Sequence, residues 1–326
     1  MPKEKRSTKF GAALIIFALC LRLLSGIWEL DVRAIRQPEP EQTQGSLLRP
    51  TQGTLAPTTQ PTAPPVTTQP PPLRQQVSFT AADMDFVQVQ YAADCPLRPA
   101  LESLLTAPFP LPEAPVVLIL HTHASESYTR QRGEHYEETA DYRTLNEAYN
   151  MLAVGDLLAE FLTEAGIRVI HDRTIHDHPS YTAAYSNARE SVRQLLRQYG
   201  DVDLVLDLHR DAAENPDGSQ YGPTVSWQGE TMARLMLVVG TNASGNYHPA
   251  WKDNLATALK LQVLLEKAVP GITRPVILRA QRFNHDLSAG AMIVEVGAAG
   301  NSRQEALNAI PVLAEAVIAL LCGQLP

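Results

Sequence analysis

Two histidines and a glutamate follow an apolar segment of this sequence, and their types suit the binding of a divalent metal ion. The segment "VLILHTHASESY" ends its apolar run at Leu120, and His121, His123 and Glu126 come next. Neutral imidazole nitrogens and carboxylate oxygens are the ligands of catalytic zinc, which keeps one position open for water. We therefore expect a metal-dependent hydrolytic site after this segment, and the sequence leaves open whether His121 contributes to it.

Two further segments carry the same types of residue. "DLHRD" contains Asp207, His209 and Arg210, and Glu295 stands in the otherwise apolar "MIVEV". A buried carboxylate is costly unless it is paired or bound to a metal ion. A carboxylate outside the ligand set can act as general base toward a water that the metal activates. His123 and His209 are therefore candidate ligands, and Glu295 is a candidate catalytic base.

Each of these residues also has a simpler interpretation. His121, His123 and Glu126 can be hydrogen-bonded loop residues, and Glu295 can form an ion pair with an arginine. The histidine-rich segment "HDRTIHDHPSY", residues 171–181, is typical of a solvated loop. The H-x-H spacing by itself is a weak signal, so the metal-site hypothesis depends on the coincidence of three segments.

Segments with strand and helix periodicity alternate along residues 77–326. Short apolar runs predict strands, amphipathic stretches predict helices, and glycine or proline follows several of them. The predicted strands are 116–120, 167–170, 202–208, 234–239, 276–278 and 291–296, and the predicted helices are 146–165, 182–199, 252–269 and 303–321. This alternation predicts an α/β fold with a mostly parallel sheet flanked by helices. Ligands bind beyond the carboxyl ends of such strands, so we expect the three segments to meet there.

The first 76 residues differ in composition from the rest. We expect a basic cytoplasmic tail at 1–9, a transmembrane signal-anchor at 10–28 and a linker rich in Pro, Thr and Gln at 29–76. The linker lacks core-forming residues and is predicted to be disordered. A cleaved signal peptide and a buried helix are the alternatives for 10–28. The prediction is a single-pass protein of the cell membrane with an extracytoplasmic domain at 77–326.

Net charge and cysteine content exclude two other classes of site. The formal net charge of −8 argues against nucleic acid as a partner, because phosphates need a basic face. The three cysteines, Cys20, Cys95 and Cys322, cannot form a disulfide framework and lack zinc-finger spacing. A bridge between Cys95 and Cys322 stays open. Any bound metal must therefore use histidine and carboxylate ligands.

Longer motifs of the chain resemble the stage II sporulation protein P family, membrane-anchored peptidoglycan hydrolases of endospore formers. The matching stretches are "LILHTHASESY", "AVGDLLAEFLTEAGIRVIHDRTIHDHPSYTAAY", "LVLDLHRDA", "LMLVVGTN", "NLATALKLQ" and "PGITRPVILRAQRFNHDLSAGAMIVEVGAAGNSRQEA". They cover most of residues 117–307 in the order of the family. The N-terminal anchor and the linker also suit the family.

The resemblance implies a fold like that of zinc-dependent N-acetylmuramoyl-L-alanine amidases, with a six-stranded, mostly parallel sheet. It implies hydrolysis of the amide between N-acetylmuramic acid and the L-alanine of the stem peptide, together with cleavage of peptide cross-links, during forespore engulfment. The implied partners are peptidoglycan, the lytic transglycosylase called stage II sporulation protein D, and its membrane partner M.

Carried over position by position, the resemblance assigns roles to the residues found above. His123 and His209 correspond to zinc ligands, and Glu295 corresponds to the catalytic carboxylate. Glu126 is the favoured third ligand because it lies next to the first histidine, and Glu147 in "NEAYN" is its rival. The identity of the third ligand stays open.

Arg210 and the motif "RFNHDLS" supply the remaining candidates. Arg210 is expected to hold a substrate carboxylate or to stabilise the tetrahedral oxyanion. Asn284, His285 and Asp286 are expected to shape the substrate groove.

Two functions of different classes compete with the zinc amidase. The first is a catalytically weak wall-binding scaffold that recruits other hydrolases, and the second is a metal-dependent carbohydrate deacetylase. The joint presence of His123, His209 and Glu295 favours an enzyme, because a scaffold needs none of them. A deacetylase would release acetate in place of stem peptides.

Overall fold

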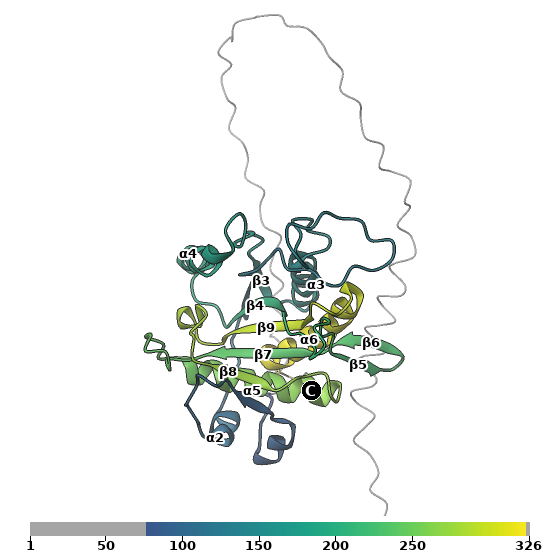
Figure 1. Cartoon of the computed structure of the whole chain (residues 1–326). Coiled ribbons are helices and arrows are strands. Elements are labelled where there is room, and N and C mark those ends of the chain that lie inside the picture. Colours follow the sequence, from purple (N-terminus) through teal and green to yellow (C-terminus); the bar gives the residue numbers. More distant parts are fainter. Residues whose placement is uncertain (1–75, 324–326) are drawn as a thin grey trace, which may run out of the picture. The chain divides into compact units, whose positions relative to one another are not determined.

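The structure is a computed structural model, which describes residues 76–323 (Figure 1). Its helices and strands alternate as the sequence predicts. They are η2 (Ala81–Phe86), β1 (Val89–Tyr91), α2 (Leu101–Thr106), β2 (Val116–Leu120), α3 (Met151–Glu164), β3 (Arg168–His171), η3 (Tyr181–Ala183), α4 (Ala184–Tyr199), β4 (Leu204–Asp211), β5 (Thr224–Trp227), β6 (Glu230–Ala233), β7 (Leu235–Gly240), α5 (Trp251–Ala268), β8 (Val276–Arg279), η4 (His285–Leu287), β9 (Ala291–Ala298) and α6 (Arg303–Cys322). The predicted tail, the signal-anchor and the linker up to residue 75 lie outside the described residues.

A seven-stranded sheet organises this part of the chain. Its order is β1-β8-β7-β9-β4-β2-β3, and five of the six neighbouring pairs are parallel, with β7 and β9 antiparallel. The predicted α/β fold with a mostly parallel sheet flanked by helices is confirmed. The six-stranded count implied by the resemblance is wrong, because β1 adds a seventh strand beside β8.

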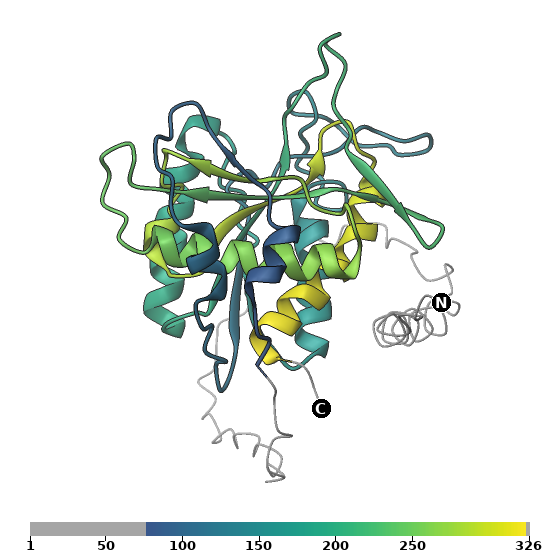
Figure 2. The same cartoon turned by 90° about the horizontal axis from the view of Figure 1, so that it is seen from below.

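The two faces of the sheet are covered by different helices. Alternate strand residues such as Leu206 and Leu208 pack with α3, α5 and α6 in the main core. In Figure 2, α5 in light green and α6 in yellow lie on the same side of the sheet. On the opposite face, Val192 of α4 packs in a cluster with Val205. Because successive strand residues point to opposite faces, His209 shares the face of Val205 and points away from the main core.

The structure adds elements that sequence periodicity did not indicate. β1 has three residues and α2 has six, which is too short to show a period. β5 and β6 form an antiparallel hairpin whose turn residues, Gln228 and Gly229, have φ values of 51° and 89°. Two positive φ values in a two-residue turn match the twist of a hairpin, but glutamine is not a usual residue for that conformation.

Helix α6 is apolar and long enough to cross a membrane by length and composition, and within residues 76–323 it is the one such helix. It begins with a capping box, in which Ser302 Oγ accepts from the Glu305 N–H and Glu305 Oε2 accepts from the Ser302 N–H at 2.9 Å. Leu313 and Val317 of this helix are fully buried in the main core. In the described structure α6 is therefore a core helix.

The surroundings of Cys95 decide whether the Cys95–Cys322 disulfide, which the sequence left open, is formed. Its buried Sγ atom lies 3.9 Å from Thr241 Oγ1, and it forms no disulfide in the described part of the chain. The bridge to Cys322 is therefore not formed.

Candidate active site

The register of the sheet brings the distant site candidates together. His209 on β4 lies directly opposite Glu295 on β9, and Asp207 lies opposite Leu120 on β2. β4 extends to Asp211, so His209 and Glu295 stand within their strands and not beyond the strand ends. The candidate site is therefore built on one face of the sheet, and the expectation of a site wholly beyond the strand ends needs this correction.

His209 lies between two carboxylates. Its Nδ1 atom is 3.4 Å from Glu126 Oε2, and its Nε2 atom is 3.0 Å from Asp207 Oδ1 without hydrogen-bond geometry. Asp207 in turn accepts from the Thr122 N–H at 2.7 Å and from Thr122 Oγ1 at 2.6 Å. Burial lowers the pKa of His209, but the two carboxylates outweigh burial and raise it well above its ordinary value.

Glu126 lies beside His209, and its rival Glu147 does not. Glu126 Oε2 accepts from the Arg210 N–H at 3.2 Å, and Arg143 Nη2 lies 3.7 Å from Glu126 Oε1. Burial would raise the pKa of Glu126, but hydrogen bonding to His209 and the charge of Arg210 lower it to about 2. Glu147 is exposed and pairs with Arg173 at 2.5 Å. Of the two candidate third ligands, Glu126 is the one that faces the candidate site.

His123 lies beside His209 and completes the cluster. The two rings are 5.3 Å apart between centroids and nearly perpendicular. His123 Nδ1 is buried without a hydrogen-bond partner, and Asp177 Oδ2 lies 3.8 Å from it. The Tyr181 ring stacks on His123 at 4.4 Å, and the Tyr185 ring meets it edge-on at 5.6 Å. Burial lowers the pKa of His123, which favours the neutral imidazole that binds metal ions.

Glu295 is the one carboxylate of the cluster without a charge partner close by. Its Oε2 atom is buried and has no hydrogen-bond partner among the described residues. Burial raises the pKa of Glu295 to about 8, the charge of His209 opposes this shift, and the charge of Glu126 adds to it. An uncompensated buried carboxyl is costly, and such groups are found more often at functional sites than elsewhere.

The clustered side chains offer the donor types that a zinc ion requires. Among residues 76–323, no three His, Cys, Asp or Glu side chains are already arranged as a metal site. The chemistry of the donors nevertheless fits zinc, because two imidazoles and one carboxylate lie together and His123 Nδ1 is an orphaned buried nitrogen. His123, Glu126 and His209 are therefore the residues that could hold a metal ion.

Arg210 is buried, and its donors are occupied. Its Nε donates to Ser127 O at 3.0 Å, its Nη2 donates to Tyr142 O at 2.9 Å, and its Nη1 lies 3.8 Å from Glu126 Oε1. Tyr142 has a left-handed backbone with φ of 54°, which places its carbonyl for this contact. These contacts favour a positioning role for Arg210 at Glu126, in place of the oxyanion or carboxylate binding expected from the sequence.

His121 points away from the cluster. Its Nδ1 pairs with Leu208 O at 3.2 Å and its Nε2 with His171 Nε2 at 2.9 Å. A Cβ atom on Gly155 would lie 2.5 Å from His121 Nε2, so α3 packs directly on this histidine pair. Burial lowers the pKa of His121 to about 3. His121 is therefore a packed core histidine on the other face of the sheet.

Asn284, His285 and Asp286 lie in the loop before β9 and brace their surroundings. Asn284 Nδ2 donates to Tyr185 O at 2.8 Å, and Asp286 forms a bidentate pair with Arg189 at 2.7 and 2.8 Å. His285 is buried, and its Nδ1 accepts from the Gly240 N–H at 3.1 Å.

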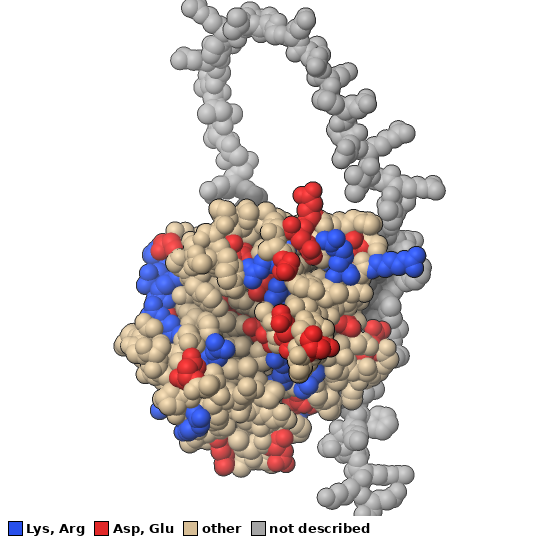
Figure 3. Space-filling model, viewed as in Figure 1, with Lys and Arg blue, Asp and Glu red and all other residues tan. Residues whose placement is uncertain are grey.

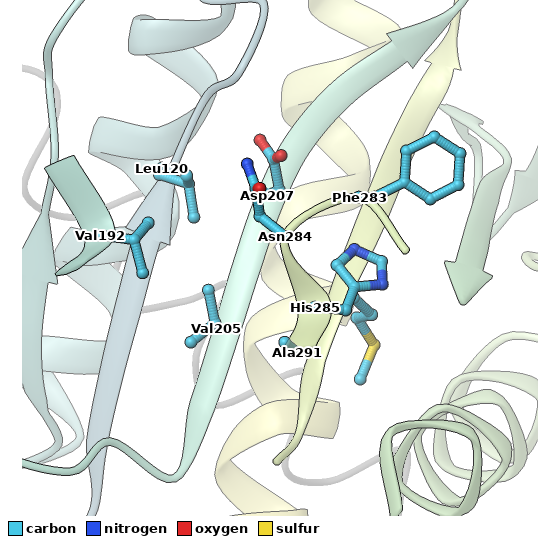
Figure 4. Close-up of a pocket in the computed structure, with 9 residues that line it drawn as sticks. Leu120, Val192, Val205, Asp207, Phe283, Asn284, His285 and Ala291 are labelled. Carbon is cyan, nitrogen blue, oxygen red and sulfur yellow. The ribbon is translucent and has the colours of Figure 1, made fainter. Parts of the chain in front are cut away.

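A small cavity separates this loop from the strands. Figure 4 shows the side chains of Asn284 and Asp207 next to each other at its wall, with His285 on the loop. The cavity measures about 10 Å³, close to the smallest volume that holds one water molecule. The loop therefore lies next to β4 at Asp207, two residues before the candidate metal ligand His209.

Comparison with known proteins assigns the chain to a family. The sequence model of the family described as Stage II sporulation protein P matches residues 107–318. The chain belongs to the stage II sporulation protein P family. It is 27% identical over 202 residues to Stage II sporulation protein P of Bacillus subtilis (strain 168), covering 58% of this chain and 47% of that protein. The chain thus matches about half the length of this curated relative.

Two solved amidases resemble the chain weakly in structure. Ami1 from Mycobacterium smegmatis has a TM-score of 0.41 and 15% identity, covering 64% of this chain and 98% of that chain. AmiC2 of Nostoc punctiforme has a TM-score of 0.39 and 11% identity, covering 64% and 97%. Because these scores are low, the fold of this family member is established by its own strand order.

Several residues of this family member near the cluster were not expected from the sequence as site residues. Asp177 accepts from Ser125 and faces His123, and Tyr181 carries Arg143 on its ring at 4.2 Å. The segment 171–181 is solvated only in part, because Asp172, His176 and Asp177 are buried whereas residues 173–174 and 178–181 are exposed. The histidines and aspartates of this segment were the available signal, but no local pattern showed which of them turn inward.

Proposed function

We propose that this protein is a zinc-dependent peptidoglycan hydrolase that cleaves the amide between N-acetylmuramic acid and the L-alanine of the stem peptide during sporulation. Membership in the stage II sporulation protein P family supports this proposal. The observation that carries it is the strand register that puts His209 opposite Glu295, with Glu126 3.4 Å from His209. Four residues from three distant segments thereby form one acidic and imidazole-rich cluster.

In this proposal His123, Glu126 and His209 hold the metal ion. When bound, zinc supplies a Lewis acid for the scissile carbonyl and lowers the pKa of a water molecule. Asp207 attracts the ring of His209 by charge from the Nε2 side, at 3.0 Å, and Thr122 fixes Asp207 by two hydrogen bonds. This arrangement is the outer-shell support that metal-binding histidines commonly have.

Glu295 is the proposed proton carrier. It takes a proton from the attacking water and delivers it to the leaving nitrogen of L-alanine. Proton uptake requires the carboxylate form, whose share grows as the pH rises toward the pKa of about 8. The charge of His209 favours this form, and a bound metal ion would favour it further. Its Oε2 atom has no hydrogen-bond partner among the described residues, which leaves it free to accept a proton from the water.

Arg143 is the proposed stabiliser of negative charge at the site mouth. Its guanidinium lies over the Tyr181 ring, 3.4 Å from Asp177 and 3.7 Å from Glu126, and its side chain is 19% exposed. It therefore reaches solvent, whereas the guanidinium of Arg210 is buried.

The cellular setting belongs to the same proposal. We infer that residues 10–28 anchor the protein in the cell membrane and that residues 77–326 lie outside the cytoplasm. Peptidoglycan is the substrate, and stage II sporulation protein D and its membrane partner M are the proposed protein partners. Analysis of the released products measures how much of the cleavage occurs at the amide and how much at the peptide cross-links.

The test is muropeptide analysis of peptidoglycan digested by the full-length protein. A chelator is expected to abolish release of stem peptides, and zinc is expected to restore it. His209→Ala should lose both the bound zinc, measured by elemental analysis, and the activity. Cleavage that persists without metal would reject this mechanism, release of acetate would indicate a deacetylase, and wall binding without any product would indicate a scaffold.

A further inference from the structure

A groove of about 500 Å³ opens beside the candidate active site. Tyr185 and Arg189 of α4 form one wall, and Arg282, Phe283 and Asn284 after β8 form the other. Clefts of this volume are typical of small-molecule and peptide subsites. We call it the α4 groove.

The α4 groove continues from the cluster that contains His123. The Tyr185 ring meets His123 edge-on at 5.6 Å on one side and lies 5.7 Å from Phe283 on the other. Tyr185 is therefore a wall shared by the groove and the candidate active site. A substrate with its scissile amide at Glu295 can extend past Tyr185 into the groove.

The charge of the groove is positive. Its lining contains Arg189 and Arg282 and no carboxylate. Behind the lining, Asp286 accepts two hydrogen bonds from Arg189, at 2.7 and 2.8 Å, and lies 3.4 Å from Arg282 Nη1. One aspartate thus pairs with two arginines, so one positive charge is left over. Arg282 makes the longer contact with Asp286, and its side chain is 31% exposed. Asp94 accepts from Gln281 and is not among the lining residues. In Figure 3, basic side chains gather along the flank where α4 lies.

The wall that carries Arg282 is fixed in place before any ligand arrives. Phe283 and Asn284 both have left-handed backbones, with φ of 50° and 66°, and a bulky residue seldom adopts this conformation. Asn284 is tied to Tyr185 O at 2.8 Å and to Arg189 at 3.2 Å. A Cβ atom on Gly240 would lie 2.5 Å from Gln281 O, so this glycine permits the close approach of the loop. Backbone strain of this kind is retained where the surroundings enforce it, and it often marks a ligand site.

We propose that the α4 groove binds the stem-peptide side of the substrate and that Arg282 pairs with a carboxylate of that peptide. This inference rests on the proposed function. The glycan part of the substrate is built of neutral N-acetylated sugars, whereas the stem peptide carries free carboxylates. A positive groove without acidic lining residues therefore matches the peptide and not the glycan.

The test compares Arg282→Gln with the wild type on a synthetic muramoyl peptide with a free side-chain carboxylate and on the same compound with that carboxylate amidated. For the wild type, amidation is expected to raise KM about tenfold with little change in kcat, as expected for loss of a charge-assisted hydrogen bond at a partly exposed site. For Arg282→Gln, KM should be high and equal on both compounds. Arg193→Gln, on an exposed position one turn along α4 from Arg189, is the matched control and should behave as the wild type.

Binding is measured separately from hydrolysis, by titration calorimetry with the free stem peptide. Weaker binding to Arg282→Gln than to the wild type supports the groove even if the protein hydrolyses neither compound, which would reject only the proposed reaction. If the wild type and Arg282→Gln discriminate equally between the two compounds, the groove assignment is overturned while the hydrolase stands. Thermal unfolding of each variant verifies that the fold is intact.

Discussion

Glu295 is the residue whose surroundings most need a functional explanation. It stands in a strand of apolar residues, its Oε2 atom lacks a partner, and burial raises its pKa to about 8. A structural carboxylate would be paired, as Asp207 and Asp286 are. The cost of leaving Glu295 unpaired is understandable if the carboxyl group handles a proton during the reaction.

Replacement of this carboxylate tests its role directly. Glu295→Gln keeps the shape of the side chain but cannot accept the proton, so we expect hydrolysis to fall by roughly 10²–10⁴-fold. Zinc content should stay unchanged, because Glu295 is not in the proposed ligand set. Glu315→Gln is the control, since burial also raises the pKa of Glu315 but it belongs to α6, and its activity should be retained. Full activity of Glu295→Gln in muropeptide assays would exclude the proposed base.

Gly155 shows how one missing side chain permits the His121–His171 pair. A Cβ atom here would lie 2.5 Å from His121 Nε2 and 2.6 Å from His171 Nε2. Gly155→Ala should therefore destabilise the fold by about 1–3 kcal/mol through overpacking, although alanine is the better helix former. Chemical denaturation measures this cost. The cost should shrink in a His171→Ala background, and an unchanged or stabilised Gly155→Ala protein would contradict the packing argument.

At the scale of elements, Lys260 joins α5 to α2. Its ammonium group is buried and donates to Leu104 O at 2.8 Å. Burial lowers the pKa of Lys260 from 10.5 to about 8. The folded state therefore holds this proton less tightly than the unfolded state does.

This difference predicts a pH dependence of stability. Between pH 8 and 10.5 the unfolded chain keeps the Lys260 proton while the folded chain loses it, so the free energy of unfolding should rise with pH in this window. The full rise corresponds to about 3 kcal/mol. Lys260→Met should lack it, whereas Lys252→Met, at an exposed position of the same helix, should keep it. Parallel stability curves for Lys260→Met and the wild type across this range would refute the assignment.

At the scale of the whole molecule, the part that begins at Pro71 forms one compact unit with its own core. α6 is long and apolar enough to span a membrane, but in this unit it packs inside and closes the main core. The unit is therefore expected to hold together without the preceding residues.

A shortened chain that begins at Pro71 tests this expectation. It should unfold in a single cooperative thermal transition when followed by circular dichroism. Leu313→Asp in the same shortened chain should remove the transition, because it places an unpaired charge in the core. Absence of a transition in the unsubstituted shortened chain would show that the unit depends on the first 70 residues.

The sequence alone determined the main elements, because apolar period and glycine or proline stops are local properties. The predicted strand at 116–120 and the helix at 303–321 agree with β2 and α6 to within one residue. The types of His123, His209 and Glu295, and their positions at or just after predicted strands, also indicated them as candidates. Short elements such as β1, and the hairpin turn at Gln228-Gly229, lacked such a signal.

Only the tertiary structure decided which of these side chains meet. The opposition of His209 and Glu295 depends on β4 and β9 being neighbours in one register, and 86 residues separate His123 from His209 in the chain. Whether His121 or His123 faces the cluster, and whether Asp177 turns inward, depends on packing against α3 and on the fold of a long loop. Strand order, register and loop packing arise from contacts between distant residues, and no local pattern encodes them.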